Sequence, residues 1–275
     1  MKKSRILFAI LCITLLAVSC QNKKIVVRHL NEKRCMEFTT GEPMPFIDEN
    51  RMQVDNEYSI ELPEEGVLPP DIYQNLINIT FNEYDDITLE EASEVFLNRT
   101  WIEDDEDYFG GFYDYKTIDS ISISPYIYAK IESKCIIDND LMTYVVNREG
   151  FTAYAAHGYF ETNIQTIDLK NNKYVFLEDL FDVTNIGKVM LQALEEVESN
   201  RFFGNNADCL FDEYKDCLPL PDCFFISMNR SVITVIYNQY SVQPYSCGQL
   251  FIELPVSWLA KHVTFTPYGK KLLKD

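Results

Sequence analysis

The stretch from Ser120 to Leu169 constrains the fold more than any other part of the chain. It is rich in β-branched and aromatic residues, and turn residues at 138–140 and 149–150 divide it into strand-length segments. Helical periodicity occurs elsewhere, over residues 71–84, 89–98 and 184–200. Because helices lie between blocks of strands without regular alternation, the sequence predicts an α+β fold of mostly antiparallel sheets, a few packed helices and two small subdomains.

Local signals mark where some elements begin and turn. Pro70 followed by Asp71 is typical of a helix start, with Asp71 as a capping residue. Thr88 with Glu91 three residues later predicts a capping box at the next helix. The Asn171–Asn172 pair predicts a hairpin, because asparagine tolerates the left-handed backbone that such turns need.

The first twenty residues have the pattern of an export signal. Cationic residues within 2–5 precede the apolar run Ile6–Val18, which is shorter than the roughly 20 residues of a membrane-spanning helix. Cys20 follows at the expected cleavage point of a lipoprotein signal, so we expect it to carry lipid and hold the protein at a membrane. An ordinary secretion signal is the alternative. Since residues 21–24 contain no acid, we expect the periplasmic face of an outer membrane, with the cell surface as the alternative.

The chain is strongly acidic, with a formal net charge of -19. An acidic surface repels phosphate backbones, so nucleic acid is not an expected partner. The same charge attracts a cationic partner, although keeping an exported protein soluble is its simpler explanation. We interpret the acidic run Glu103–Asp107 as a solvated loop, because it lacks the glycine and distal glutamate of a calcium-binding EF-hand.

Six cysteines remain outside the signal segment and its lipidated end, and an even number in an exported protein predicts disulfides. We expect Cys35 to pair with Cys135, and the loop at 209–223 to be tied to itself and to Cys247. A zinc site is the alternative, but no CxxC pair or neighbouring histidine supports it, and we expect no metal. The disulfide candidates are Cys35, Cys135, Cys209, Cys217, Cys223 and Cys247.

Three groups of residues follow one another in the second half of the chain. They are Ala156–His157 ahead of a strand; Asp168–Leu169 with Lys173 and a Leu-x-Asp-Leu-Phe motif ending at Phe181; and Tyr240, Pro244, Tyr245, Gly248, Pro255 and Leu259. In this order they resemble the RsiV-like domain of unknown function. Residues 58–98 are similar to the domain that precedes peptidoglycan deacetylase domains. Two places depart from the family pattern: Tyr154–Ala155 replace a Gly-Gly pair, and Asn172 replaces the hairpin glycine.

The signal pattern, the composition of the chain and the resemblance together predict four segments. Residues 1–19 are the lipoprotein signal peptide, 20–33 a tether, 34–150 an N-terminal α+β subdomain and 151–275 the RsiV-like C-terminal domain. Relatives of this kind occur as extracytoplasmic parts of membrane-anchored proteins, and one branch is the sensor region of an anti-sigma factor that binds lysozyme. We therefore expect a non-enzymatic, cofactor-free binding or sensing module whose partner is a cationic lysozyme-type protein or a peptidoglycan fragment. An envelope glycan hydrolase or deacetylase accessory is the alternative.

The residues that resemble the family have structural and functional interpretations. His157, Asp168, Phe181 and Gly248 are interpreted as structural. His157 has the strand parity of core-type neighbours, and no nucleophile or orienting carboxylate is indicated for catalysis, so we expect its ring to bond a nearby loop. Tyr240, Pro244 and Tyr245 form either a ligand-contact loop or a rigid connector whose tyrosine packs inward. The connector is favoured, because proline and glycine fix the backbone there.

Overall fold

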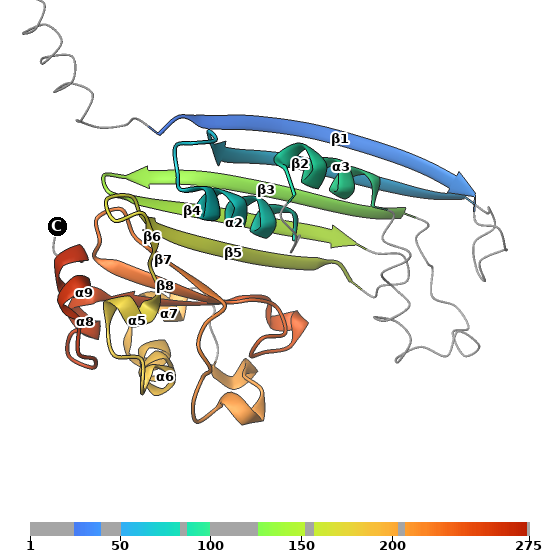
Figure 1. Ribbon diagram of the computed structural model, residues 1–275. Coiled ribbons are helices and arrows are strands. Elements are labelled where there is room, and N and C mark those ends of the chain that lie inside the picture. Colours follow the sequence, from blue (N-terminus) through green and yellow to red (C-terminus); the bar gives the residue numbers. More distant parts are fainter. Residues whose placement is uncertain are drawn as a thin grey trace, which may run out of the picture.

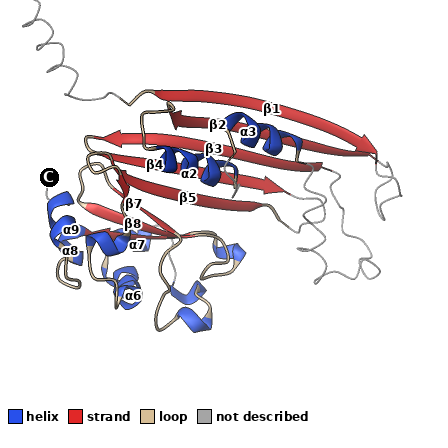
Figure 2. Ribbon diagram, viewed as in Figure 1, coloured by secondary structure: helices blue, strands red, loops and turns tan. Residues whose placement is uncertain are grey.

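The structure is a computed structural model of the chain, and it describes residues 25–39, 51–82, 87–99, 126–151, 157–202 and 207–273. The signal segment, Cys20 and the acidic run Glu103–Asp107 lie outside these residues. Figures 1 and 2 show two sheets with helices packed on them. Across the described ranges, no helix is long and apolar enough to cross a membrane.

The larger sheet has the strand order β1-β2-β3-β4-β5-β6. All of its neighbouring strands are antiparallel except β2 and β3, which run parallel. A parallel pair needs a long crossover, and the described part of the connection from β2 to β3 contains helices α2 and α3. Its strands are β1 Val27–Thr39, β2 Arg51–Pro63, β3 Tyr126–Asp138, β4 Leu141–Phe151, β5 Tyr159–Asp168 and β6 Lys173–Tyr174.

The smaller sheet is antiparallel and consists of β7 (Cys223–Ile226), β8 (Val232–Tyr237) and β9 (Leu250–Pro255). Together the two sheets confirm the α+β fold with mostly antiparallel pairing that the sequence predicts. The turn between β7 and β8 includes Arg230 in the left-handed conformation.

Helices α2 (Pro70–Phe81) and α3 (Leu89–Asn98) cover one face of the larger sheet. The capping box of α3 is confirmed: the Glu91 amide donates to Thr88 Oγ1, and the Thr88 amide donates to the Glu91 carboxylate. The expected cap of α2 is wrong by two positions. Pro69 occupies the cap position, and Asp71 lies in the first turn, where it makes no capping hydrogen bond.

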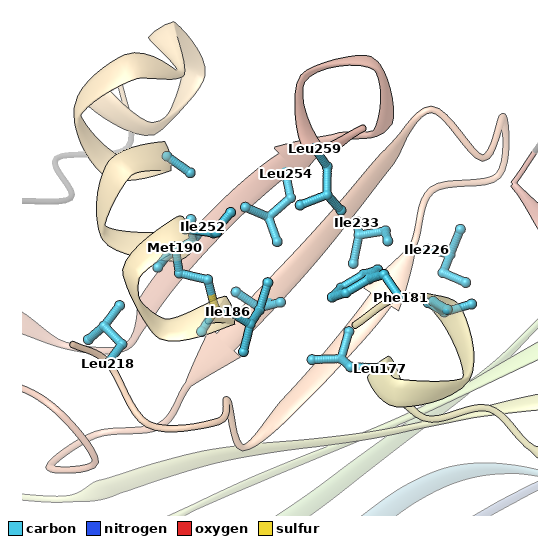
Figure 3. Close-up of a cluster of buried hydrophobic side chains, with 14 of the residues drawn as sticks. Leu177, Phe181, Ile186, Met190, Leu218, Ile226, Ile233, Ile252, Leu254 and Leu259 are labelled. Atoms are coloured by element: carbon cyan, nitrogen blue, oxygen red, sulfur yellow. The ribbon is translucent and has the colours of Figure 1, made fainter. Parts of the chain in front are cut away.

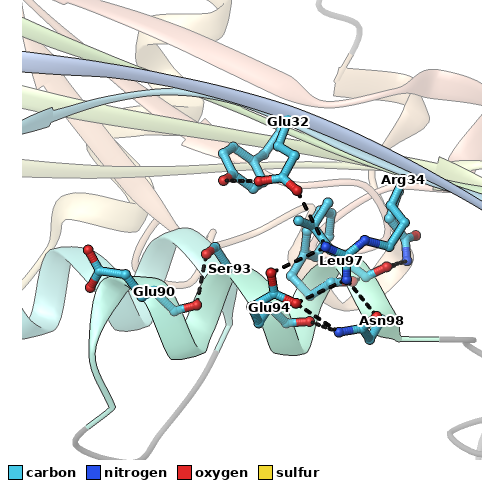
Figure 4. A network of polar contacts seen from close by, with 10 residues as sticks. Glu32, Arg34, Glu90, Ser93, Glu94, Leu97 and Asn98 are labelled. Carbon is cyan, nitrogen blue, oxygen red and sulfur yellow. Dashed lines mark hydrogen bonds and ion pairs between the residues drawn. The ribbon is translucent and has the colours of Figure 1, made fainter.

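A buried asparagine and an arginine fix α3 on the sheet. Asn56 of β2 is fully buried, and its side-chain amide donates to the carbonyls of Phe96, Leu97 and Arg99 at the end of the helix. Figure 4 shows Arg34 of β1 reaching the same helix, where its guanidinium donates to Glu94 and Asn98. The Asn56 contacts satisfy backbone carbonyls that the last turn of a helix leaves without partners, and the Arg34 contacts hold side chains of the same turn.

Strand β1 corrects the predicted tether. Its pairing with β2 begins at Val27 opposite Pro63 and continues to Thr39, so residues 27–33 belong to the sheet. The sequence of β1 is dominated by charged and polar residues. This composition is typical of a tether, but it also suits an exposed edge strand. Charge on an edge strand opposes pairing with another chain.

Helices α5 to α9 pack around the smaller sheet, and Figure 3 shows the apolar core there, including Phe181, Met190 and Leu254. The helix predicted over 184–200 is interrupted at Val197. There the buried Asn200 side chain turns to β9, donating to the Glu253 carbonyl and accepting from the Glu253 amide. The helices are α5 Leu177–Leu180, α6 Ile186–Glu196, α7 Glu198–Phe202, α8 Val256–Leu259 and α9 Pro267–Leu272.

The predicted subdomain boundary between residues 150 and 151 falls inside the larger sheet. Strand β5 follows that boundary, yet it pairs along its whole length with β4, which precedes it. The division between the two units comes after β6. The smaller unit packs on β5 through β7, where Ile164, Cys223 and Ile236 form a shared apolar cluster.

Gly187 in α6 permits a close approach that any side chain would block. A Cβ atom at this position would lie 2.0 Å from the Leu218 carbonyl oxygen. We expect Gly187→Ala to lower the free energy of unfolding by about 1–2 kcal/mol, because overpacking outweighs the gain of about 1 kcal/mol in helix propensity. Lys188→Ala, at the exposed neighbouring position, is the control and changes stability by less than about 0.5 kcal/mol. Chemical denaturation measures both, and a Gly187→Ala protein as stable as the wild type contradicts this packing.

Candidate functional site

All six cysteines predicted to form disulfides are free thiols. The pairing of Cys35 with Cys135 is wrong for reasons of register. Cys35 lies opposite Asp55, and Asp55 lies opposite Tyr128. Cys135 is 135 - 128 = 7 residues farther along β3, about 23 Å at a rise of about 3.3 Å per residue. A disulfide needs Cα atoms within roughly 7 Å of each other.

Two cysteines of the predicted 209–223 loop bond to backbone carbonyls. The Cys217 thiol donates to the neighbouring Leu218 carbonyl at 3.6 Å, and the buried Cys223 thiol donates to the Thr162 carbonyl of β5 at 3.5 Å. Burial raises the pKa of Cys223 to about 12, so this thiol stays protonated at neutral pH. Cys223 therefore contributes to the contact between the two units.

His157 lies just before β5, which begins at Tyr159, so the predicted strand does not extend through His157 and Gly158. The imidazole is held on two sides. Its Nε2 is 2.9 Å from the Tyr240 hydroxyl, and its Nδ1 is 3.0 Å from the Gly158 carbonyl. Its ring stacks on Tyr245 with centroids 3.6 Å apart and planes 13° apart. The expected bond from this histidine to a neighbouring loop is therefore present, over a separation of 83 residues.

We call His157, Tyr240 and Tyr245 the aromatic cluster. The Tyr240 ring lies 5.9 Å from His157 and 6.0 Å from Tyr245, and 56% of the residue is exposed. Its backbone is left-handed, with φ of 66°. For a bulky residue this conformation costs on the order of 1–3 kcal/mol, and such outliers concentrate at functional sites. Tyr240 thus combines exposure, backbone strain and a fixed ring.

The segment that carries both tyrosines is the 238–249 loop, which joins β8 to β9. Its first residue is fixed on the free edge of β5: the Thr162 amide donates to Asn238 Oδ1 at 2.8 Å, and Asn238 Nδ2 donates to the Thr162 carbonyl at 3.0 Å. The Phe160 amide donates to the Gln239 side chain at 3.1 Å. Asp222 holds the same turn by accepting from the Asn238 amide and the Ser241 hydroxyl, each at 2.6 Å.

The inner part of the 238–249 loop is also fixed. The buried Gln243 side chain donates to the carbonyls of Cys247 and Gly248. Pro244 accepts the Cys247 amide, and Gly248 has φ of 74° and ψ of -150°, which glycine tolerates far better than other residues. Hydrogen bonds therefore hold both ends of the loop, which turns Tyr245 onto His157 and presents Tyr240 to solvent.

The hydrogen bonds of His157 define what its imidazole can do. Because Nδ1 faces a carbonyl, it carries the proton of the neutral ring, and Nε2 accepts from the Tyr240 hydroxyl. Taking a proton from a substrate would require Tyr240 to move away. No group of three histidine, cysteine or acidic side chains within the described part of the chain has the arrangement of a metal site.

Asp168 and Phe181 lie apart from the aromatic cluster in the hydrogen-bond pattern. Asp168 closes the β5–β6 hairpin by accepting from the Tyr268 hydroxyl at 2.6 Å, from the Asn171 side chain at 2.6 Å and from the Lys170 amide at 3.0 Å. Phe181 is buried and packs edge-to-face on Phe265. Burial alone raises the pKa of Asp168, but these hydrogen bonds outweigh it, and the pKa is lowered.

No pattern in the sequence indicates the residues that position the cluster. Asn238, Gln239 and Asp222 act through side-chain contacts with segments far away in the chain, and such contacts leave no local pattern. The one available signal is that Asn238 and Gln239 directly follow a strand that ends at Tyr237.

No protein-family model matches the sequence of this chain, and no curated protein matches it. Solved structures do match this chain, and two of them are DUF3298 family proteins. A member of the DUF3298 family from Bacteroides fragilis is 19% identical, with a TM-score of 0.56, over 91% of this chain and 99% of that chain. A DUF3298 family protein from Pseudomonas aeruginosa is 12% identical, with a TM-score of 0.49, over 90% of this chain and 97% of that chain. The first likeness shows that this chain has the fold of a DUF3298 domain, which is a domain of unknown function.

The lowered pKa of Asp168 predicts an acid-sensitive contribution to stability. A carboxyl whose pKa is lower in the folded state stabilises the fold above its unfolded pKa near 4, and this contribution is lost as pH falls further. We expect Asp168→Asn to lower the free energy of unfolding at pH 7 by about 1–3 kcal/mol, and to lose less stability than the wild type between about pH 5 and pH 2.

Denaturation at several pH values measures this effect. Glu213→Gln is the control, since Glu213 is an exposed acidic residue of the same unit. Parallel pH profiles for Asp168→Asn and the wild type are incompatible with a lowered pKa at Asp168.

Proposed function

We propose that this protein is a lipid-anchored component of the bacterial cell envelope that binds a partner through the aromatic cluster and catalyses no reaction. Tyr240 carries the proposal, because an exposed ring is held in a strained backbone by a loop fixed at both ends. The N-terminal segment ending at Cys20 supports acylation and export, with the periplasmic face of the outer membrane as the proposed location.

The surface around the cluster favours a macromolecular partner. Tyrosine is enriched among the residues that dominate protein interfaces, and rings that are already ordered lose little entropy on binding. Small ligands usually take concave sites. The hollow of about 360 Å³ between α2 and the β5–β6 hairpin is lined by other residues, including Asp71, Lys173 and Phe176.

The charge of the chain favours a cationic partner. With a net charge of -19, the protein attracts basic proteins over long distances, which speeds association and makes it sensitive to salt. The resemblance of residues 151–261 to an RsiV-like domain points to the same chemistry, since one branch of that family binds lysozyme. We therefore propose a cationic, lysozyme-type protein as the partner.

Titration with hen-type lysozyme at low and moderate salt tests the proposal. We expect micromolar or tighter binding that weakens with salt, and a loss of tenfold or more in Tyr240→Asn, about 1.4 kcal/mol. Asparagine tolerates the left-handed backbone at this position, so the variant removes the ring while keeping the loop. Phe176→Ala is the matched control, because Phe176 is an aromatic residue that is 51% exposed and lies outside the cluster.

Three outcomes count against the proposal. If the wild type does not bind at micromolar concentration, lysozyme-type proteins are not its partners. If Tyr240→Asn binds as tightly as the wild type, the cluster is not the contact surface. If purified protein binds peptidoglycan fragments and does not bind lysozyme, the partner is a wall glycan. If it hydrolyses those fragments, the protein is an enzyme.

A further inference from the structure

The hollow between α2 and the β5–β6 hairpin has a volume of about 360 Å³, and it shares no residue with the aromatic cluster. Figure 1 shows α2 beside this hairpin. The volume is at the small end of the range for ligand sites, so the hollow suits a small molecule. Three segments line it: Asp71 and Ile72 of α2; Asn172, Lys173 and Tyr174 of the hairpin; and Phe176 and Asp179 at α5.

Hydrogen bonds hold the walls of the hollow in place. The Tyr174 hydroxyl accepts from Asn75 Nδ2 at 3.0 Å and donates to the Ile72 carbonyl at 3.3 Å, which joins the hairpin to α2. The Phe176 amide donates to Asp179 Oδ2 at 3.0 Å, which fixes the first turn of α5. A ligand therefore meets walls that are already ordered, and ordering them costs little of its binding energy.

The charges that line the hollow leave one negative charge in excess. They are two carboxylates and one ammonium group. The ammonium of Lys173 donates to Asp179 Oδ1 at 3.0 Å and lies 4.3 Å from the centroid of the Tyr268 ring, so its charge is already compensated. No ion pair among the described residues includes Asp71, an exposed residue in the first turn of α2. The remaining charge of the hollow is therefore that of Asp71, which attracts a cation.

Two aromatic rings form adjacent walls of the hollow. The ring centroids of Tyr174 and Phe176 are 6.3 Å apart, and their planes are 47° apart. An aromatic ring attracts a cation that lies within about 6 Å of its centroid. Because the two centroids are so close, one cation can lie within this distance of both. Phe176 is 51% exposed, so its ring is still available to a ligand.

We propose that this hollow binds a small organic cation with a methylated ammonium head group, such as trimethylammonium. The rings of Tyr174 and Phe176 attract the head group, and the Asp71 carboxylate balances its charge. An anion does not suit the site, because Lys173 is already paired with Asp179 and the remaining charge is negative.

The hydrogen bonds of the walls favour a methylated head group over a primary amine. A primary ammonium group carries three N–H donors that need acceptors. Both oxygens of Asp179 are engaged, by Lys173 and by the Phe176 amide. The Tyr174 hydroxyl already bonds on two sides. A head group without N–H donors leaves no donor unsatisfied in the hollow. The inference concerns this hollow alone and does not depend on the proposed lysozyme-type partner.

Titration of the full chain with choline, followed by NMR at constant ionic strength, tests the proposal. We expect saturable shifts of the Ile72, Asn172 and Tyr174 amides with a dissociation constant of about 1–5 mM, since a ligand of so few atoms binds weakly. Two matched ligands serve as controls. Ethanolamine lacks the methyl groups, and the carbon analogue of choline lacks the charge. Each should bind at least about fivefold more weakly than choline.

Two variants test the lining residues. Asp71→Asn removes the charge, and Phe176→Leu removes the ring while keeping an apolar side chain. Each should weaken choline binding at least about fivefold. Glu178→Gln is the control and should bind like the wild type, because Glu178 is an exposed acid of α5 that does not line the hollow.

The ligand series decides the matter on the wild type even if a variant folds poorly. The proposal is overturned if about 20 mM choline gives no saturable shift, because the expected affinity would then be saturated. It is also overturned if the carbon analogue or ethanolamine binds as tightly as choline, or if folded Asp71→Asn and Phe176→Leu both bind like Glu178→Gln.

Discussion

The reciprocal pair of hydrogen bonds between Asn238 and Thr162 is the contact on which the rest of the site depends. Strand β5 is bonded to β4 along one side, but on its other side β6 reaches only Ile167 and Asp168. The open edge is covered by side chains of the smaller unit in place of a strand: Asn238 binds both backbone groups of Thr162, and Gln239 binds Phe160. This arrangement protects the edge and sets the position of the following tyrosines at once.

A second polar anchor holds the two units together at the opposite end of β5. The guanidinium of Arg230, buried in the left-handed turn between β7 and β8, donates to Asp140 at 2.6 Å and to the Leu272 carbonyl at 3.0 Å. Asp140 belongs to the β3–β4 turn of the larger sheet, whereas Leu272 ends α9. One buried cation therefore joins three segments, and the apolar cluster around Cys223 fills the interface between the anchors.

Features with local signals could be predicted from the sequence, and features set by distant contacts could not. The Thr88 capping box and the Asn172 hairpin were predictable because a few neighbouring residues determine them. Strand β1 was missed in part because its charges suit both an edge strand and a tether. His157 and Tyr240 are both candidate residues in the sequence, but no sequence pattern indicates that they meet. The strand register and the Asn238 hydrogen bonds bring them together.

Native-state hydrogen exchange at the Thr162 amide tests the central claim that β5 and the 238–249 loop form one rigid platform. We expect a strongly protected amide, and at least tenfold faster exchange in Asn238→Ala, while Asn163, opposite Val146 of β4, keeps its protection. If the wild-type Thr162 amide exchanges at the rate of an open edge strand, or at a rate that Asn238→Ala leaves unchanged, Asn238 does not anchor the loop on β5.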